Sequence, residues 1–344
     1  MDRFPIARAA DVWVEMIAAA RSTLDIGQFY IANQPGHRME PVLDAVVAAG
    51  QRGVRVRVLV DGKFFKTYGD DARRLGAHPG IELLPIDFEQ LSRGVLHAKY
   101  MIVDRSDAFL GSQNFDWRSL EHIVELGIRF RVPALIDPIC DIFETDWGLA
   151  SGQPADFRVS TSTHAYPVSV EHNGGIVECT PALSHHGFLP TPSLWDLPSI
   201  LAAINKATHS ISVQLMTYET LEYHSEEWTE IDDALRAASA RGVVVTLMAA
   251  DDARKNAQNM KTLLSLNELP GVRVLLVTIP ESLQGPIEYA RLTHSKFMTV
   301  DCKWSWIGTG NWSKGYFYDS RNVGLCIAGA TFTSELQQIF DLLA

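Results

Sequence analysis

Cysteine is scarce in this chain. Its 344 residues include four cysteines, Cys140, Cys179, Cys302 and Cys326, which lie far apart and form no C-x-x-C pair. This pattern indicates neither a disulfide framework nor a cysteine-ligated zinc site. We expect the four side chains to be buried free thiols, which is typical of a protein in a reducing compartment.

Long hydrophobic runs are also missing. No window approaches the run of about 18 apolar residues that a membrane-spanning helix requires. The N-terminal stretch MDRFPIARAADVWVEM lacks a basic start followed by an apolar core, so no signal peptide is predicted. We expect a soluble, cytoplasmic protein without an integral membrane span. A secreted or lysosome-like lumenal location is the alternative if a signal or anchor has been removed.

Positive charge is in deficit. The formal net charge is −11, and no polybasic run occurs. Proteins that bind long nucleic acid along its backbone usually carry a basic stripe, so this mode of binding is disfavoured. Any substrate that contains phosphate must therefore be held by a local site.

What the chain does contain is a repeated order of helix and strand patterns. The apolar share of 47% is that of a globular protein with a large core. Strands are predicted in STLDIGQFYI, RGVRVRVLVDG and IELLPI, and again in HSISVQLMTY, RGVVVTLMAAD and VRVLLV. Each half then has a strand predicted to end at Gly127 or Gly324 and a closing amphipathic helix, ALIDPICDIFETDWGLA or TFTSELQQIFDLLA.

These patterns predict an α/β fold of two pseudo-symmetric halves, residues 1–155 and 195–344. Each half should be a mixed β-sheet flanked by helices, with a shared site at the interface between the halves. Residues 156–194 are rich in Ser, Thr, Pro and Gly, which predicts a linker with loops.

A second duplication carries polar residues. The stretch VLHAKYMIVDRSDAFLGSQNF contains His97, Lys99, Asp104 and Asn114, and ARLTHSKFMTVDCKWSWIGTGNW repeats the same residue types at the same separations. The second set is His294, Lys296, Asp301 and Asn311. A lone His-x-Lys on a strand is ordinarily a solvent-facing pair, whereas matching duplicates in two related halves indicate a common site. We expect the two aspartates, at the far ends of their strands, to make structural hydrogen bonds.

The chemistry of such a site follows from its residue types. Histidine and lysine two positions apart on a strand project from the same face, so two related halves would supply two imidazoles, two ammonium groups and two carboxamides. The lysines and asparagines could surround a phosphodiester, whose transition state gathers charge on its nonbridging oxygens. One histidine could attack phosphorus while the other protonates the leaving oxygen. The lysines supply positive charge, so the sequence predicts no metal and no cofactor.

The duplicated H-x-K-x(4)-D followed by G-x-x-N resembles the motif of the phospholipase D superfamily. The stretches GVLHAKYMIVD, LGSQNFDWRSLEHIVELG, CTPAL and THSKFMTVDCKWSWIGTGNWSKGYF are most similar to the branch with phospholipases D3 and D4 and related poxviral enzymes. The resemblance implies a phosphohistidine intermediate and, as the better-known activity of the branch, five-prime exonuclease action on single-stranded DNA and RNA. Phosphatidyl transfer and DNA nicking among relatives keep a phospholipase or another phosphodiesterase open as alternatives.

The resemblance also implies roles for particular residues. His97 and His294 match the nucleophile and acid/base histidines, and Lys99, Lys296, Asn114 and Asn311 match the residues that hold phosphate. Glu125 matches a carboxylate that orients its histidine, while the equivalent position in the second half is Asn322. We therefore predict that His97, oriented by Glu125, is the nucleophile and that His294 is the acid.

Aromatic and small polar residues beside the motifs are candidates for contacts with substrate. Stacking of unpaired bases on aromatic rings would suit a single-strand nuclease, although each ring could equally fill the core. The predicted substrate-binding residues are Phe29, Tyr30, Tyr218, Trp312, Ser112 and Thr309. The expected partner is single-stranded nucleic acid or a phospholipid, and no obligate protein partner is implied.

Overall fold

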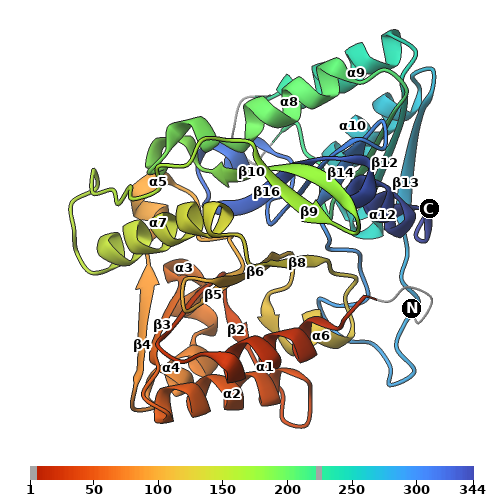
Figure 1. The fold of residues 1–344 in the computed structure, drawn as a ribbon. Coiled ribbons are helices and arrows are strands. Elements are labelled where there is room, and N and C mark those ends of the chain that lie inside the picture. Colours follow the sequence, from red (N-terminus) through yellow and green to blue (C-terminus); the bar gives the residue numbers. More distant parts are fainter. Residues whose placement is uncertain (1–5, 222–226) are drawn as a thin grey trace.

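Two mixed β-sheets, one from each half, form the framework of the molecule (Figure 1). The computed structural model describes residues 6–221 and 227–344. The strands of the first sheet lie in the order β4 (Ile81–Ile86), β3 (Arg55–Asp61), β1 (Thr23–Gln28), β5 (Tyr100–Val103), β6 (Asp107–Gly111) and β8 (Gly127–Phe130).

The second sheet repeats this order and adds two strands. Its order is β13 (Val272–Val277), β12 (Val244–Ala250), β11 (Ser210–Gln214), β14 (Phe297–Val300), β15 (Trp304–Gly308), β16 (Asn322–Ala328), β10 (Gly175–Ser184) and β9 (Val168–His172). In each sheet the first three strands are parallel and the next three antiparallel. The predicted α/β fold with two similarly ordered halves is therefore confirmed.

Helices cover the outer faces of the sheets and fill the space between them. Helices α1 (Ala9–Ala19) and α2 (Met39–Gln51) pack on the outer face of the first sheet, at the bottom of Figure 1. Helices α8 (Asp196–Lys206), α9 (Glu230–Ala240) and α10 (Ala257–Asn267) pack on the second sheet. The shorter elements are α3 (Gly62–Tyr68), α4 (Asp70–Gly76), α5 (Phe88–Ser92), α6 (Trp117–Glu121), α11 (Lys314–Tyr318), β2 (Ile31–Ala32), β7 (Phe115–Asp116) and three 3₁₀ turns, His186–Phe188, Pro192–Leu194 and Asp251–Lys255.

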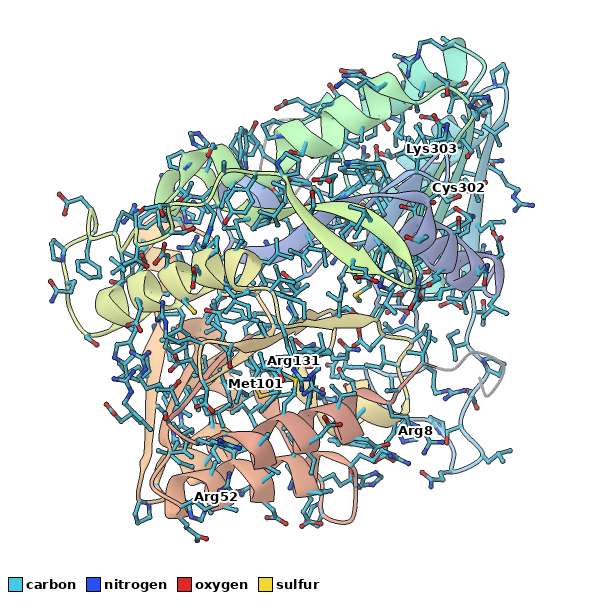
Figure 2. All side chains as sticks on the ribbon, in the orientation of Figure 1. Arg8, Arg52, Met101, Arg131, Cys302 and Lys303 are labelled. Carbon is cyan, nitrogen blue, oxygen red and sulfur yellow. The ribbon has the colours of Figure 1, made fainter. Side chains whose placement is uncertain are left out.

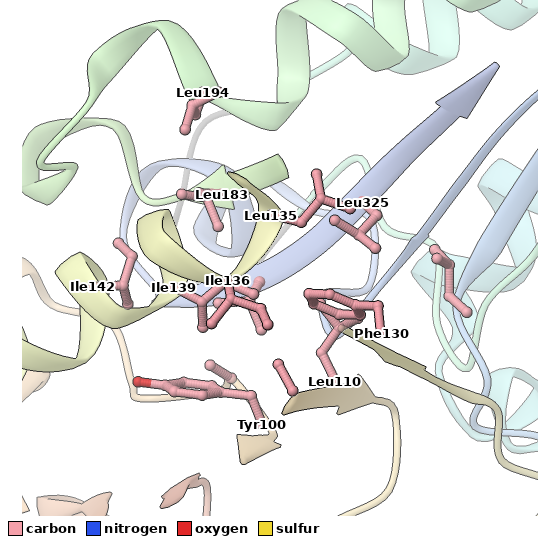
Figure 3. Close-up of a cluster of buried hydrophobic side chains, with 14 of the residues drawn as sticks. Tyr100, Leu110, Phe130, Leu135, Ile136, Ile139, Ile142, Leu183, Leu194 and Leu325 are labelled. Carbon is pink, nitrogen blue, oxygen red and sulfur yellow. The ribbon is translucent and has the colours of Figure 1, made fainter. Parts of the chain in front are cut away.

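The inner faces of the two sheets share one hydrophobic core with α7 (Pro133–Ala150) and α12 (Ala330–Asp341). In Figure 3, Tyr100 and Leu110 of the first sheet approach Leu183 and Leu325 of the second, with Ile139 of α7 between them. Each of these side chains is at most 2% exposed. Burying one Leu or Ile contributes about 1.5–3 kcal/mol, so the shared core holds the two halves in one fixed arrangement.

Two predictions about the elements are wrong in detail. The predicted linker at 156–194 contains β9 and β10, which extend the second sheet, because β10 pairs antiparallel with both β9 and β16. The strand expected to end at Gly127 instead begins there, and β16 runs past Gly324 to Ala328.

Two further expectations concern the burial of the cysteines and the absence of a membrane-spanning helix. All four cysteines are free, and three are buried as expected, whereas Cys302 is exposed in the turn after β14 (Figure 2). Within the two described ranges, no helix combines the length and the apolar character needed to cross a bilayer.

Candidate active site

The two motif histidines lie at the interface, in segments that pair with the opposite half. The backbone N–H of His97 donates to the carbonyl of Arg321 at 3.0 Å, and the N–H of His294 donates to the carbonyl of Val124 at 2.8 Å. Strands β5 and β14 begin only after the two lysines, so each His-x-Lys occupies the segment that leads into its strand. This cross-pairing brings both motifs to one place.

Each imidazole is also held by a side chain from the other half. Both carboxylate oxygens of Glu125 accept from Nδ1 of His294, at 2.9 and 3.0 Å. Nδ1 of His97 lies 3.1 Å from Oδ1 of Asn322. The prediction that Glu125 orients His97 is therefore wrong. The backbone hydrogen bond from His294 to Val124, the residue before Glu125, places this carboxylate beside His294.

The surroundings of Asn322 fix the tautomer of His97. The Nδ2 group of Asn322 donates to the carbonyl of Tyr316 at 2.9 Å and faces the Ser184 hydroxyl at 3.2 Å. Oδ1 accepts from the hydroxyl of Thr309 at 3.0 Å. The amide oxygen must therefore face the imidazole, so Nδ1 of His97 carries the hydrogen and Nε2 carries the free lone pair.

Ser112 and Thr309 lie behind the residues that hold the histidines. Both are fully buried. The hydroxyl of Ser112 helps to lower the pKa of Glu125 and also bonds to the backbone of Leu126. In this structure the hydroxyl groups of these two residues position Glu125 and Asn322, and their contact with substrate stays a prediction.

The amino groups of the two motif lysines are buried. Lys99 Nζ donates to the carbonyl of His97, and Lys296 Nζ donates to the carbonyl of His294. Burial and the other ammonium group lower the pKa of Lys99 well below its usual value, and burial lowers that of Lys296 to about 7. Such desolvated cations interact strongly with an anion that enters the site.

Burial and neighbouring charges shift the pKa values of both histidines and of Glu125. Burial and the charges of Lys99 and Lys296 hold the pKa of His97 well below its usual value. Burial also lowers the pKa of His294, but Glu125 opposes the shift. Burial raises the pKa of the Glu125 carboxyl, yet His294 and Lys296 keep it below its ordinary value. The site therefore contains a neutral imidazole with a neutral partner and an imidazole that a carboxylate stabilises in its protonated form.

The two motif asparagines occupy related positions. Nδ2 of Asn114 faces the hydroxyl of Tyr30 at 3.4 Å, and Nδ2 of Asn311 faces the hydroxyl of Tyr316 at 3.3 Å. Oδ1 of Asn311 accepts from the backbone N–H of Met216 at 3.1 Å. Each asparagine thus directs its amide N–H₂ group toward a tyrosine hydroxyl.

The four predicted aromatic contacts separate into two pairs. The ring centroid of Phe29 lies 5.0 Å from that of His97, and Tyr30 is half-buried beside it with its hydroxyl 2.8 Å from Asp116. Tyr218 and Trp312 are 2% and 1% exposed and belong to the core of the second half. The prediction that Tyr218 and Trp312 bind substrate is wrong, because no ring face is available for stacking.

Two other aromatic residues lie at the site: Tyr316, in a stretch whose aromatic residues the sequence already indicated, and Phe64, which sequence reasoning missed. The Tyr316 ring packs against His97 with centroids 5.0 Å apart, and Phe64 of α3 packs against Phe29 with centroids 4.1 Å apart. Tyr316 lies in the aromatic stretch GYFYDSR close to the second motif, and that stretch is a candidate for base stacking on sequence alone. Phe64 gave no such signal, because it is distant in sequence from both motifs.

Asp104 and Asp301 have the structural role expected of them. The carboxylate of Asp104 accepts from the backbone N–H groups of Ser22 and Thr23, and that of Asp301 accepts from His209 and Ser210. Each aspartate therefore ties the end of a motif strand to the start of its neighbour, β1 or β11.

Comparisons with known proteins agree with this geometry. The family model described as "Cardiolipin synthase, PLD-like domain" matches residues 13–147 and 200–344. Phospholipase D Z of Dictyostelium discoideum is 31% identical, over 96% of this chain and 83% of its own length. The rat protein named 5'-3' exonuclease PLD3 is 32% identical, over 96% of this chain and 73% of its own length.

The chain belongs to the phospholipase D superfamily. Phosphatidylserine synthase of Haemophilus influenzae shares the fold, with a TM-score of 0.67 and 12% identity over 96% of this chain and 83% of its own. As a member of the superfamily, the protein is a phosphodiesterase. The relatives named as exonuclease and as phospholipase D are about equally similar to it.

Proposed function

We propose that the protein is a metal-independent 5'-exonuclease that acts on single-stranded DNA or RNA through a phosphohistidine intermediate. The observation that carries the mechanism is the unlike pairing of the two histidines, His97 with Asn322 and His294 with Glu125. An amide partner favours a neutral imidazole, whereas a carboxylate partner favours an imidazolium.

In the first step His97 is the nucleophile. Its Nε2 lone pair attacks phosphorus, a P–N bond forms, and the bond from phosphorus to the leaving oxygen breaks. The imidazolium of His294 gives its Nε2 proton to that oxygen. The assignment of His97 as nucleophile is thus the one expected from sequence, but its basis is the amide partner and not Glu125.

In the second step His294 is the base. Its neutral Nε2 takes a proton from water, the resulting hydroxide attacks phosphorus, and the P–N bond to His97 breaks. The imidazolium of His294, again stabilised by Glu125, is then ready for the next cycle. Lys99, Lys296 and the two motif asparagines would donate to the nonbridging oxygens, where charge develops in both transition states.

A row of aromatic rings favours a single nucleic-acid strand as substrate. From His97 the row runs through Phe29 and Phe64 to Tyr68, with centroids 5.0, 4.1 and 6.0 Å apart. Tyr68, at the end of α3, is 63% exposed, so the row reaches from the buried imidazole to the surface. Bases of a flexible strand stack on such rings without sequence preference.

The histidines themselves are narrowly accessible, His97 at 5% and His294 at 8% exposure. This supports the capture of a flexible strand end and disfavours a duplex. The net charge of −11 likewise disfavours tracking along a duplex backbone.

Phospholipase D activity is the second candidate. The Dictyostelium relative named phospholipase D Z is 31% identical over nearly the whole chain, and a phosphatidyl group presents the same phosphodiester to the same residues.

Product analysis on end-labelled strands, beside a lipid panel, tests both proposals. Single-stranded DNA and RNA with a 5'-hydroxyl should release mononucleotides stepwise from the 5' end in the presence of EDTA. H97N protein serves as the control for contaminating nucleases. A ladder that starts at the 3' end, or no cleavage, would refute the exonuclease proposal. Choline release from phosphatidylcholine vesicles at a comparable rate would establish the lipase instead.

A further inference from the structure

A cluster of two imidazoles and a carboxylate lies outside the catalytic residues. His37 belongs to the turn between β2 and α2, and Glu121 and His122 lie at the end of α6. Nδ1 of His37 is 3.1 Å from Oε2 of Glu121, and Nε2 of His122 is 3.9 Å from the same oxygen. One ligand atom from each residue lies within 4.8 Å of the other two.

A hydrogen bond from the backbone orients the carboxylate of Glu121. The N–H of Arg38 donates to Oε1 of Glu121 at 2.6 Å, which leaves Oε2 facing both imidazoles. Oε2 of Glu121 and one nitrogen of each imidazole therefore form a set of three possible ligand atoms.

The hydrogen bonds of the cluster do not include Nε2 of His122. It is buried and has no hydrogen-bond partner among the described residues, and its side chain is 10% exposed. Trp117 packs against both imidazoles, with centroids 4.5 Å from His37 and 5.5 Å from His122. A buried nitrogen without a partner is unfavourable, and a bound ion would remove that cost.

We propose that His37, Glu121 and His122 bind one Zn²⁺ ion. Zinc takes imidazole nitrogen at about 2.0–2.1 Å and carboxylate oxygen at about 2.0–2.2 Å, usually in tetrahedral geometry. Tetrahedral ligand atoms would then be about 3.3–3.5 Å apart, and the two distances seen here, 3.1 and 3.9 Å, lie on either side of that range. Three protein ligands leave the fourth position for water.

The position of the cluster suggests what the ion does. Glu121 and His122 lead directly to Val124, whose carbonyl holds His294, and to Glu125. A bound ion would tie this segment to the turn at His37. It would strengthen the support of the catalytic carboxylate and take no part in the attack on phosphorus.

Zinc titration of the metal-free full-length protein tests the proposal. After treatment with EDTA and desalting, competition against a chromophoric chelator should show one tight site per chain. Replacing a ligand, H122A or H37A, should weaken binding at least about tenfold, since loss of even an outer-sphere partner typically costs 10–100-fold. Zinc should also raise the Tm of the wild type but not that of H122A.

Two variants distinguish this site from other zinc-binding groups. H172Q removes a surface histidine that pairs with Glu335 at 3.0 Å and belongs to no cluster of three possible ligands among the described residues, so it should bind zinc as the wild type does. H294N removes a catalytic imidazole and should also retain the site. Loss of binding in H294N with retention in H122A would assign the ion to the catalytic histidines and overturn the proposal. No binding by folded wild type, or equal binding by all variants, would overturn it as well.

Discussion

The carboxylate of Glu125 lies 2.9 and 3.0 Å, through its two oxygens, from Nδ1 of His294, the histidine of the opposite half. Asn322 takes the corresponding place beside His97 at 3.1 Å. The two imidazoles therefore differ in the charge of their partner, and most of the predictions below depend on this difference.

Replacing each histidine should give a different response to the leaving group. H294N should lose about 10²–10⁴-fold in rate on an oligonucleotide, which is the usual contribution of a general acid. On a p-nitrophenyl phosphodiester, whose leaving group needs no proton, H294N should recover most of the rate of bond cleavage, measured as the p-nitrophenol burst. H97N should be inactive on both substrates. Recovery by H97N and not by H294N would reverse the two roles.

The pH profile of kcat/KM should be bell-shaped, with its maximum on the acidic side of neutrality. Burial and the two lysines hold the pKa of His97 well below its usual value, so the rising limb should lie well below pH 6.5. The falling limb reflects proton loss from His294, whose pKa burial also lowers, and from Lys296 with a pKa of about 7. The fitted values belong to the coupled site as a whole. A flat profile between about pH 5 and 8 would contradict this mechanism.

Replacement of Glu125 by Gln should lower kcat and move the falling limb to lower pH. The carboxylate stabilises the imidazolium of His294, so its removal lowers the pKa of that residue and the acid form is lost earlier as pH rises. The matched control is E335Q, which removes a carboxylate from the exposed pair with His172. Its profile should be unchanged, and an unshifted profile in E125Q would refute the proposed role of the carboxylate.

Tyr68 should contribute to strand affinity without contributing to stability. Stacking of one base is worth about 1–3 kcal/mol, so Y68A should raise KM for a single-stranded oligonucleotide by about 5–150-fold, with an unchanged Tm. The matched control is I176A, because Ile176 is equally exposed at 63%. W312A should behave in the opposite way and lose about 3–5 kcal/mol of unfolding free energy, since Trp312 is in the core. Wild-type KM in Y68A would remove Tyr68 from the binding path.

Asp301 should stabilise the fold in a pH-dependent manner. Burial raises its pKa, but hydrogen bonds from Ser210, Thr208 and His209 lower it to about 2. The depressed pKa means that the stabilisation is present above about pH 4 and disappears as the pH falls toward 2. D301N should therefore cost about 2 kcal/mol of unfolding free energy at pH 7, measured by urea unfolding, and less at pH 3. The exposed D252N is the control; an equal cost at both pH values would contradict the linkage.

Much of the site could be predicted from the repeat, because duplicated residues must occupy related places in two halves of the same fold. The two His-x-Lys segments lie at the interface, each paired with the opposite half through the backbone of its histidine. The partner of each histidine could not be predicted in this way. It depends on the bridges Leu96–Arg321 and Val124–Thr293, which join segments far apart in the chain, and no periodicity within one half encodes them.

Other differences have local causes. The sequence VSVEHNGGIVECT alternates apolar and polar residues around Asn173-Gly174, a strong hairpin signal, and the composition of the surrounding segment concealed it. Asn173 and Gly174 have φ values of 47° and 77°, as the turn of such a hairpin requires. Tyr218 and Trp312 were mistaken for binding residues because proximity to a motif in sequence does not determine which face of the chain is buried.

Had this site been assembled from two identical subunits, both imidazoles would necessarily have received the same neighbour. A single gene product with an internal duplication is free of that constraint, and Glu125 and Asn322 make use of the freedom. One imidazole can specialise in attack and the other in proton delivery, a division of labour that a strictly twofold assembly of the same fold could not encode.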